Sequence, residues 1–366
     1  MKILILTNHS YMLYRFRLEL ICELSKSHEI VLAMPFVGHE EDFCRLGFRC
    51  ISIDIDRRGI NPFKDGKLFD VYQKLLKTEA PDLVITYSIK PNIYGGFACR
   101  MAKIPYCANV QGLGTAFERP VLARLVSMLY RGALAKAKTV FFENQENAAL
   151  FVKKHILLPS RQTVLRGAGI NLEKYPYANY PNHDVFHFLY LGRIMKEKGM
   201  DELFSAVNRL AKEYPNRFVL DLVGFYEDAY REQVEALVDA GLVKFHGFQN
   251  DPRLFYENAD CVVLPSYHEG MSNVLLEAAA MGRPLITSDI PGCREAVDHG
   301  VTGYLCEARN ADSLYSAMEK MLLQSRDERV QMGLYGNQKM EAEFDKKVVV
   351  HQTIQAFILS GGIENA

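Results

Sequence analysis

The chain has 366 residues and a formal net charge of −1, with 49% hydrophobic and 24% charged residues, an ordinary globular composition. Its length exceeds the size at which one hydrophobic core usually stops growing, which predicts two domains, and the absence of any run of 18 apolar residues excludes a membrane-spanning helix. The eight cysteines are scattered, with no Cys-x-x-Cys and no clustered histidines, which argues against disulfides and zinc and for a reducing cytoplasm.

The first half of the chain alternates apolar, strand-like runs with helix-like segments. Strands separated by helices of this length are typical of βαβ units, so the pattern predicts a parallel sheet with helices on its faces. The candidate strands are 3–8, 29–35, 50–55, 82–88, 106–110 and 139–143. The candidate helices are 13–24, 69–78, 93–102 and 120–137.

The periodicity lapses at residues 170–185, where a Pro/Asn-rich stretch predicts a linker. A second series of strands and helices follows and predicts a second domain of similar size. Its candidate strands are 186–192, 218–224, 243–248, 261–265, 284–289 and 303–306. We therefore expect an α/β protein with two doubly wound Rossmann-like domains facing across a cleft. They comprise residues 1–170 and 171–344, and a helix at about 345–360 packs back on the first.

The strongest functional signal is the stretch Glu269-Gly270-Met271-Ser272-Asn273-Val274-Leu275-Leu276-Glu277, which follows the apolar strand 261–265. It predicts a helix that begins at the carboxyl end of a parallel strand, where unpaired N–H groups suit a phosphate or a sugar hydroxyl. The first glutamate lies before the helix and the second about two turns inside it, so the two carboxylates meet different parts of one ligand. An ordinary capping region with surface glutamates is the alternative.

Arg193 and Lys198 lie in the loop after strand 186–192, again at the carboxyl end of a strand. Two fixed cations at this place suit a diphosphate, which Arg binds through two hydrogen bonds and Lys as a point charge. A solvated charged loop is the alternative. Three loops, 193–198, 247–248 and 269–277, converge on one sheet edge, and this favours the functional interpretation.

Together these motifs resemble those of the retaining, nucleotide-sugar-dependent glycosyltransferases of family 4, which have the GT-B fold. The resemblance covers almost the whole chain. In the second domain it is carried by Gly192-Arg193, Lys198-Gly199, Glu269 through Glu277, and Gly303 in a Thr-Gly-Tyr-Leu turn. In the first domain, segments 11–17, 89–95 and 109–114 are similar to the subgroup that elongates lipid-linked precursors of capsule, exopolysaccharide or O-antigen.

The resemblance implies that Arg193 and Lys198 hold the donor diphosphate and stabilise the leaving group. It implies that Glu277 accepts hydrogen bonds from the ribose and that Phe248 lies near the base. Glu269 would contact the donor sugar, in a pocket formed with Gly270, Met271, Ser272 and Asn273. The two cations would replace the divalent metal of other glycosyltransferases, so we expect neither a metal nor another cofactor.

Three residues of the first domain are expected at the acceptor or cleft side of the site. Lys90 and Asn92 directly follow strand 82–88 and would contact a phosphate, whereas a solvated helix start after Pro91 is the alternative. Family members commonly have a His in a first-domain loop near the donor sugar, and the corresponding loop here contains Gln111 instead. Gln111 would either position a sugar hydroxyl or have no catalytic role.

Charge is distributed unevenly along the chain. Residues 1–170 contain 24 basic and 15 acidic residues, and the remainder contains 19 and 29. The first half therefore faces an anionic partner, or the two domains attract each other. In segment 119–138, Arg and Lys interleave with apolar residues, as in helices on anionic membranes and equally in core helices with snorkelling cations. We expect a cytoplasmic protein, peripheral on the inner face of the cell membrane, with no nucleic-acid partner.

The expected reaction is transfer of a hexose-type sugar from a nucleotide sugar, UDP-linked, to an undecaprenyl-diphosphate-linked saccharide in bacterial surface polysaccharide or glycan assembly. One alternative is the same chemistry with a soluble acceptor. Another is a non-catalytic nucleotide-sugar-binding subunit of an assembly complex. An oxidoreductase is disfavoured, because no Gly-x-Gly-x-x-Gly follows the first strand.

Overall fold

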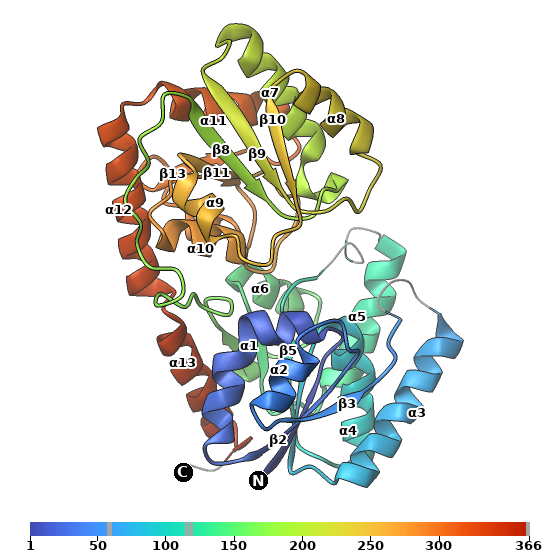
Figure 1. The fold of residues 1–366 in the computed structure, drawn as a ribbon. Coiled ribbons are helices and arrows are strands. Elements are labelled where there is room, and N and C mark those ends of the chain that lie inside the picture. The colour runs from blue at the N-terminus through green and yellow to red at the C-terminus, as the bar shows by residue number, and fades with distance from the viewer. Residues whose placement is uncertain (57–60, 114–116, 118–119, 364–366) are drawn as a thin grey trace. The chain divides into compact units, whose positions relative to one another are not determined.

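The computed structural model describes residues 1–56, 61–113, 117 and 120–363. The chain divides into two compact units (Figure 1). The N-terminal unit contains Met1–Ala168 and the chain from Lys347 onward, and the C-terminal unit is Gly169–Lys346. Each unit is built on one parallel sheet with helices against it, as the alternating pattern predicts.

The described part of the N-terminal unit has a seven-stranded parallel sheet in the order β3-β2-β1-β4-β5-β6-β7. The order of the strands reverses between β1 and β4. In such sheets, ligands bind outside the carboxyl ends of the strands at the point of reversal. The strands are β1 (Lys2–Leu6), β2 (Glu29–Met34), β3 (Arg49–Ser52), β4 (Leu83–Tyr87), β5 (Tyr106–Val110), β6 (Val140–Phe142) and β7 (Gln162–Val164).

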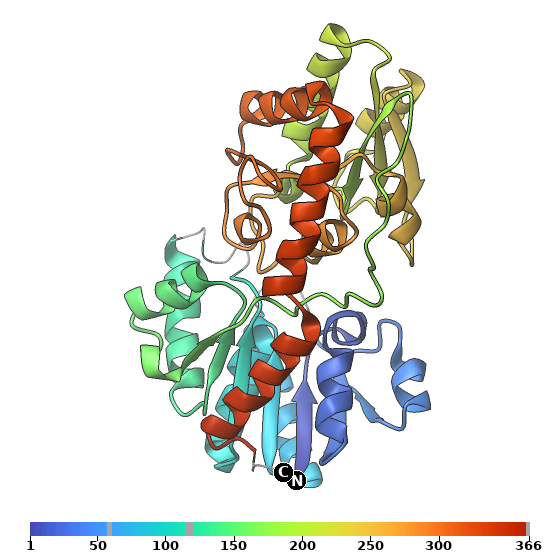
Figure 2. The same cartoon turned by 90° about the vertical axis from the view of Figure 1, so that its left-hand side faces the viewer.

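Helices cover this sheet, and one of them comes from the end of the chain. Helix α13 (Lys346–Leu359) buries Val349 and Phe357 in the same core as Ile3 and Ile5. The ring centroid of Phe357 lies 5.0 Å from that of Phe141. Figure 2 shows α13 running along the N-terminal unit. The helices are α1 (Ser10–Ser25), α2 (Glu40–Arg45), α3 (Pro62–Glu79), a π-helical turn (Pro91–Gly95), α4 (Gly96–Ala102), α5 (Pro120–Leu134), α6 (Gln145–Lys153) and α13 (Lys346–Leu359).

The C-terminal unit repeats this plan. Its described strands form a six-stranded sheet in the order β10-β9-β8-β11-β12-β13, so the reversal lies between β8 and β11. The strands are β8 (Phe186–Leu191), β9 (Phe218–Val223), β10 (Val243–Gly247), β11 (Cys261–Leu264), β12 (Leu285–Ser288) and β13 (Gly303–Cys306). The helices are α7 (Met200–Glu213), α8 (Arg231–Asp239), α9 (Arg253–Asn258), α10 (Asn273–Ala280), α11 (Ala311–Leu323) and α12 (Arg326–Glu343).

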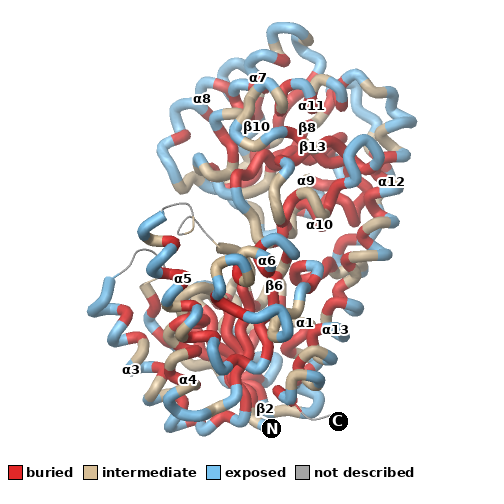
Figure 3. Tube along the Cα trace, turned by 180° about the vertical axis from the view of Figure 1, so that it is seen from behind, coloured by how far each residue is buried: buried red, intermediate tan, exposed pale blue. Residues whose placement is uncertain are grey.

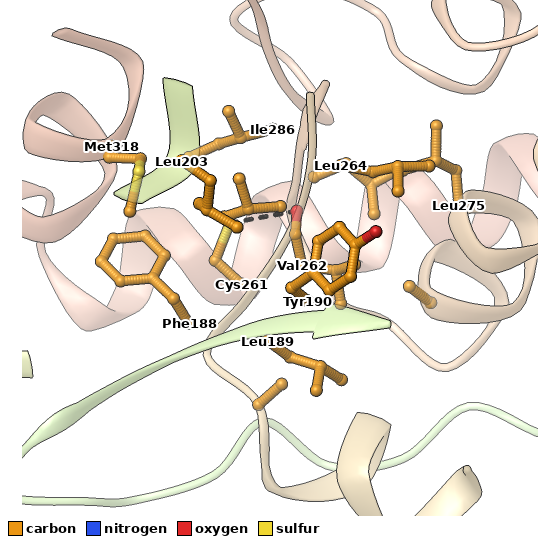
Figure 4. Packing of buried hydrophobic residues seen from close by; sticks show 14 of the residues in the cluster. Phe188, Leu189, Tyr190, Leu203, Cys261, Val262, Leu264, Leu275, Ile286 and Met318 are labelled. Atoms are coloured by element: carbon orange, nitrogen blue, oxygen red, sulfur yellow. Dashed lines mark hydrogen bonds between the residues drawn. The ribbon is translucent and has the colours of Figure 1, made fainter. Parts of the chain in front are cut away.

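The central strands are apolar because helices cover both of their faces. All four residues of β11 are buried, and Figure 3 shows buried residues concentrated in the sheets of both units. Beside Cys261 of β11, the side chains of Phe188 and Met318 lie close together (Figure 4). This packing holds β8 and β11 in the core of the unit, and the loops that follow these strands carry the candidate site.

The Pro/Asn-rich stretch at 170–185, whose composition predicts a linker, packs against the C-terminal unit. The hydroxyl of Tyr180 donates to the carbonyl of Asp260 at 2.9 Å, and the amide of Ala178 donates to the carbonyl of Met281 at 3.3 Å. The buried guanidinium of Arg283 donates to the carbonyl of Asn179 at 3.0 Å. These contacts attach the segment to the unit, so the chain passes between units at 168/169.

Candidate functional site

The loop after β8 is held tightly against the end of β11. Gly199 has a φ of 74°, and a Cβ at this position would lie 2.1 Å from the carbonyl oxygen of Pro265, so only glycine fits. The amide of Tyr267 donates to the carbonyl of Glu197 at 2.9 Å. Lys198 therefore lies at the carboxyl end of the sheet, at the point where the order of the strands reverses.

Lys198 and Glu269 form an ion pair across this point of reversal. Both side chains are about 15% exposed. The hydroxyl of Ser266 donates to the same carboxylate oxygen, Oε1 of Glu269, at 2.9 Å. The ammonium group of a lysine has three N–H donors, so it can hold this carboxylate and a phosphate oxygen together. The pair places a cation and a carboxylate at one edge of a sheet.

Contacts with the rest of the C-terminal unit hold the loop between Glu269 and α10 in place. The amide of Ser272 donates to the carbonyl of Gly292 at 2.8 Å, so it is already used within the protein. The side chain of Met271 is buried in the hydrophobic core. Both residues therefore support the loop, and their expected place in the sugar pocket stays a prediction. Gly270 and Asn273 lie on either side of them, and Asn273 is the first residue of α10.

Glu277 is the fifth residue of α10, so it lies one turn inside the helix and not two as expected. It is buried, and its Oε2 accepts a hydrogen bond of 2.8 Å from the hydroxyl of Tyr256 in α9. Tyr256 is itself fully buried. The orientation of this carboxylate is therefore set by a side chain that lies 21 residues away in the sequence.

Arg193 lies beside the same edge but is half exposed. Its guanidinium donates to Oε2 of Glu227 at 2.6 Å, and its backbone carbonyl accepts a hydrogen bond of 2.7 Å from the hydroxyl of Tyr190. Burial and the nearby charge of Glu269 raise the pKa of Tyr190 well above its ordinary value. Tyr190 is therefore a neutral donor that holds the backbone of the loop beneath Arg193.

Phe248 directly follows Gly247, the last residue of β10. Because β8, β9 and β10 are adjacent parallel strands, Phe248 lies at the same edge of the sheet as Arg193 and Lys198. About 52% of its surface is exposed.

The three candidates of the N-terminal unit have different environments. Lys90 forms an ion pair of 2.8 Å with Asp65, so its charge is already compensated. Asn92 is fully buried, accepts from the hydroxyl of Thr86 at 2.6 Å and donates to the carbonyl of Asn109 at 2.8 Å. The expected contact of Asn92 with a phosphate is therefore wrong, because its amide ties β4 to β5 in the interior.

Gln111 follows β5 and is partly exposed. It accepts a hydrogen bond from the hydroxyl of Ser88 at 3.4 Å and its amide contacts the sulfur of Met12 at 3.2 Å. Ser88 directly follows β4 and has a φ of 76°, a backbone conformation that is uncommon for non-glycine residues. The carboxyl edge of this sheet therefore holds a polar group at its own point of reversal.

Sequence patterns did not identify Ser266, Glu227 and Tyr256, which contact the predicted site residues. Ser266 stands three residues before Glu269, and this spacing is a usable signal. Glu227 and Tyr256 are distant in sequence from their partners, and no local pattern marks them. Within the described ranges, His, Cys, Asp and Glu form no group of three or more that is arranged to hold a metal ion.

Two protein-family models match the chain, one in each half. Residues 2–144 match the model described as "Glycosyl transferase 4-like". Residues 185–324 match the model described as "Glycosyl transferases group 1". The second match contains Arg193, Lys198, Glu269 and Glu277.

Two curated relatives align over most of the chain. The N,N′-diacetylbacillosaminyl-diphospho-undecaprenol α-1,3-N-acetylgalactosaminyltransferase of Campylobacter jejuni is 28% identical over 377 residues, covering 98% of this chain and 98% of the relative. The UDP-Gal:α-D-GlcNAc-diphosphoundecaprenol α-1,3-galactosyltransferase of Escherichia coli is 27% identical over 329 residues, covering 84% and 80%. Among solved structures, Anabaena HepE in complex with UDP has a TM-score of 0.79 at 16% identity, over 98% of this chain and 99% of that one.

Proposed function

Because the chain belongs to the glycosyltransferases with the GT-B fold, we propose that it moves a hexose-type sugar from a UDP-sugar to a saccharide on a lipid diphosphate. The transfer proceeds with retention and without a metal ion, in the assembly of a bacterial surface polysaccharide or glycan. The relatives that align over most of the chain are named for acceptors of this kind.

The proposal is carried by the ion pair between Lys198 and Glu269 at the point of strand reversal. Glycosyl transfer develops positive charge on the donor sugar and negative charge on the departing diphosphate. Lys198 and Arg193 supply positive charge for the diphosphate, and Glu269 lies one contact away, where the sugar attached to that diphosphate would be. The site thus has cations for the diphosphate of the donor and a carboxylate for its sugar.

The remaining residues position the donor. Glu277, oriented by Tyr256, accepts hydrogen bonds from the ribose, and Phe248 lies near the base. Gly270 and Asn273 border the sugar near the start of α10, where the partial positive charge of the helix N-terminus favours sugar oxygens. Gln111 positions a hydroxyl of the donor or acceptor sugar.

Association with an anionic membrane fits a lipid-linked acceptor. On α5, Val121, Leu125 and Met128 are exposed, and their spacing of four and three residues places them on one helix face. Arg124 and Arg131 are exposed on the same helix. An apolar stripe flanked by arginines is typical of helices that lie on anionic lipid. In the described part of the chain no helix has the length and apolarity to cross a membrane.

The experiment that tests the donor assignment is titration calorimetry of the purified chain with UDP, GDP and ADP, without metal. We expect UDP to bind most tightly and Lys198→Ala to weaken UDP roughly 10- to 150-fold, because one hydrogen bond to a charged group is worth about 1.5–3 kcal/mol. Lys196→Ala is the matched control: this lysine lies in the same loop and is largely exposed, so its loss leaves UDP affinity unchanged.

The variant Glu269→Gln tells a role in contacting the donor sugar from a role in binding the nucleotide. UDP lacks the sugar, so this variant binds UDP at least as tightly as the wild type, whereas its turnover with the UDP-sugar falls by about 100-fold or more. Turnover is followed as UDP release in the presence of a lipid-diphosphate-linked saccharide and, separately, of the same saccharide without the lipid. Failure of every nucleotide to bind the wild type would refute the proposal, and equal use of the free saccharide would refute the lipid-linked acceptor.

A further inference from the structure

Two phenylalanines are exposed side by side at the carboxyl edge of the C-terminal sheet. Phe225 follows β9 by two residues and Phe248 follows β10 directly. About 46% and 52% of their surfaces are exposed, and their ring centroids are 6.1 Å apart with an angle of 66° between the planes. Exposed aromatic rings gathered at a sheet edge that already carries cations indicate a binding surface.

The neighbouring aromatic pair differs. Tyr226 and Phe245 also contact each other, with centroids 5.0 Å apart, but the guanidinium of Arg231 lies over the ring of Tyr226 at 5.0 Å. In this second pair, one of the two rings, Tyr226, is thus covered by the protein's own cation. It provides a comparison for the first pair, because Phe245 is likewise partly exposed, at about 36%.

Backbone hydrogen bonds fix the first pair relative to Arg193. The amide of Ile194 donates to the carbonyl of Phe225 at 2.9 Å, and the amide of Gly224 donates to the carbonyl of Gly247 at 2.9 Å. A Cβ on Gly224 would lie 1.8 Å from the carbonyl oxygen of Gly192, so the loops after β8 and β9 are in direct backbone contact. The two rings and the proposed diphosphate cation are therefore parts of one rigid edge.

The geometry also limits how a flat ligand binds. A ring inserted between two others needs about 7 Å between parallel planes, twice the roughly 3.5 Å of a van der Waals contact. A separation of 6.1 Å with tilted planes is too narrow for this insertion. A planar ring instead stacks on the face of one phenylalanine and meets the edge of the other, which is a favourable arrangement of aromatic rings.

We propose that Phe225, together with Phe248, forms the nucleobase end of the donor site and that Phe225 contributes to nucleotide affinity by stacking. This rests on the proposed function, because the nucleotide is the ligand whose diphosphate Arg193 and Lys198 would hold. Stacking tolerates any base, since every base has a π-face. The rings therefore contribute affinity, and selection among bases comes from other groups.

The test compares the UDP affinities of Phe225→Ala, Phe245→Ala and Phe225→Tyr by titration calorimetry. Loss of one base–aromatic contact weakens UDP roughly 5- to 150-fold in Phe225→Ala. Phe225→Tyr keeps the ring and restores affinity to within about twofold of the wild type. Phe245→Ala removes a ring of the other pair and leaves UDP affinity unchanged. Melting temperatures of the unliganded variants verify that all three fold.

The outcomes separate this inference from the proposed function. Wild-type protein that binds no nucleotide refutes both. Wild-type protein that binds UDP while Phe225→Ala binds it equally well refutes the stacking role alone. An equal loss of affinity in Phe245→Ala, or a failure of Phe225→Tyr to restore it, also overturns the role of Phe225, because the effect is then not specific to its ring.

Discussion

The contribution of the Tyr256 hydroxyl to the stability of the fold can be measured by removing this one group. It donates to Glu277, a carboxylate that is almost completely buried. Tyr256→Phe removes this donor without changing the shape of the ring. We expect the free energy of unfolding to fall by about 1–3 kcal/mol, the usual cost of removing a hydrogen-bond partner from a buried polar group. Urea denaturation measures the change.

Tyr335→Phe is the control for this measurement, because Tyr335 is an exposed tyrosine of α12 in the same unit. Because this residue is exposed, removal of its hydroxyl is expected to leave the unfolding free energy within about 0.5 kcal/mol of the wild type. If Tyr256→Phe behaves like Tyr335→Phe, the hydrogen bond does not stabilise the buried carboxylate.

Sequence patterns located the candidate site residues that follow strand ends but not the residues that orient them. Lys198 and Glu269 each follow an apolar run, and such runs reveal which edge of a parallel sheet their loops occupy. Asn92 follows a strand in the same way, yet its amide turns into the interior to bond Thr86. The direction of a polar side chain depends on packing between β4 and β5, which no local pattern records.

At the scale of elements, Asp221 of β9 joins three neighbouring strands. Its carboxylate bonds His187 of β8 at 2.6 Å and His246 of β10 at 2.7 Å. The ring of His187 also contacts that of His183 in a tilted arrangement, and its backbone amide donates to the carboxylate of Asp260 at 2.8 Å. Burial alone would raise the pKa of Asp221, but the hydrogen bonds to both histidines outweigh it and lower the pKa below its ordinary 3.8.

A lowered pKa in the folded state means that ionised Asp221 stabilises the fold at pH above 3.8, and that this stabilisation is lost as the pH falls through the folded value. We therefore expect Asp221→Asn to lower the unfolding free energy by about 1–2 kcal/mol at pH 7. The difference from the wild type shrinks as the pH is lowered toward 3. Urea denaturation at several pH values measures it.

Asp251 supplies the matched control. Its pKa is lowered to about 2, chiefly by the hydrogen bond from Arg253, but both side chains are about half exposed. Exposed pairs contribute little because water screens them. Asp251→Asn therefore changes stability by less than about 0.5 kcal/mol at pH 7. A pH-independent effect of Asp221→Asn would contradict the assignment of its stabilising role to charge.

At the scale of the whole molecule, the exposed face of α5 predicts binding to vesicles that contain anionic lipid. Binding is expected at low salt and weakens as salt rises, because Arg124 and Arg131 supply attraction that salt screens. Leu125→Ser with Met128→Ser removes two apolar contacts and lowers the sedimented fraction severalfold. The control is Leu254→Ser, at a leucine of the C-terminal unit that is at least as exposed as Leu125 and Met128. Equal sedimentation with neutral vesicles would exclude an electrostatic contribution.

The order of strands and helices could largely be predicted, because each central parallel strand is a continuous apolar run between turn residues. Most strand boundaries differ from the expected ones by one to three residues. Strand β7 was missed because it is a three-residue edge strand with no buried residue. Helix α2 was missed because it buries only Phe43 and therefore has no apolar stripe.

Because of helix α13, the core of the N-terminal unit is completed only at the end of synthesis. The ribosome produces the first 168 residues early, yet the core they form includes Val349 and Phe357, which are translated after the whole C-terminal unit. At roughly 5–20 residues per second, the chain between them takes on the order of 10–35 s to make. During that interval the nascent sheet lacks one of its covering helices, and its apolar face is open to chaperones or to other nascent chains.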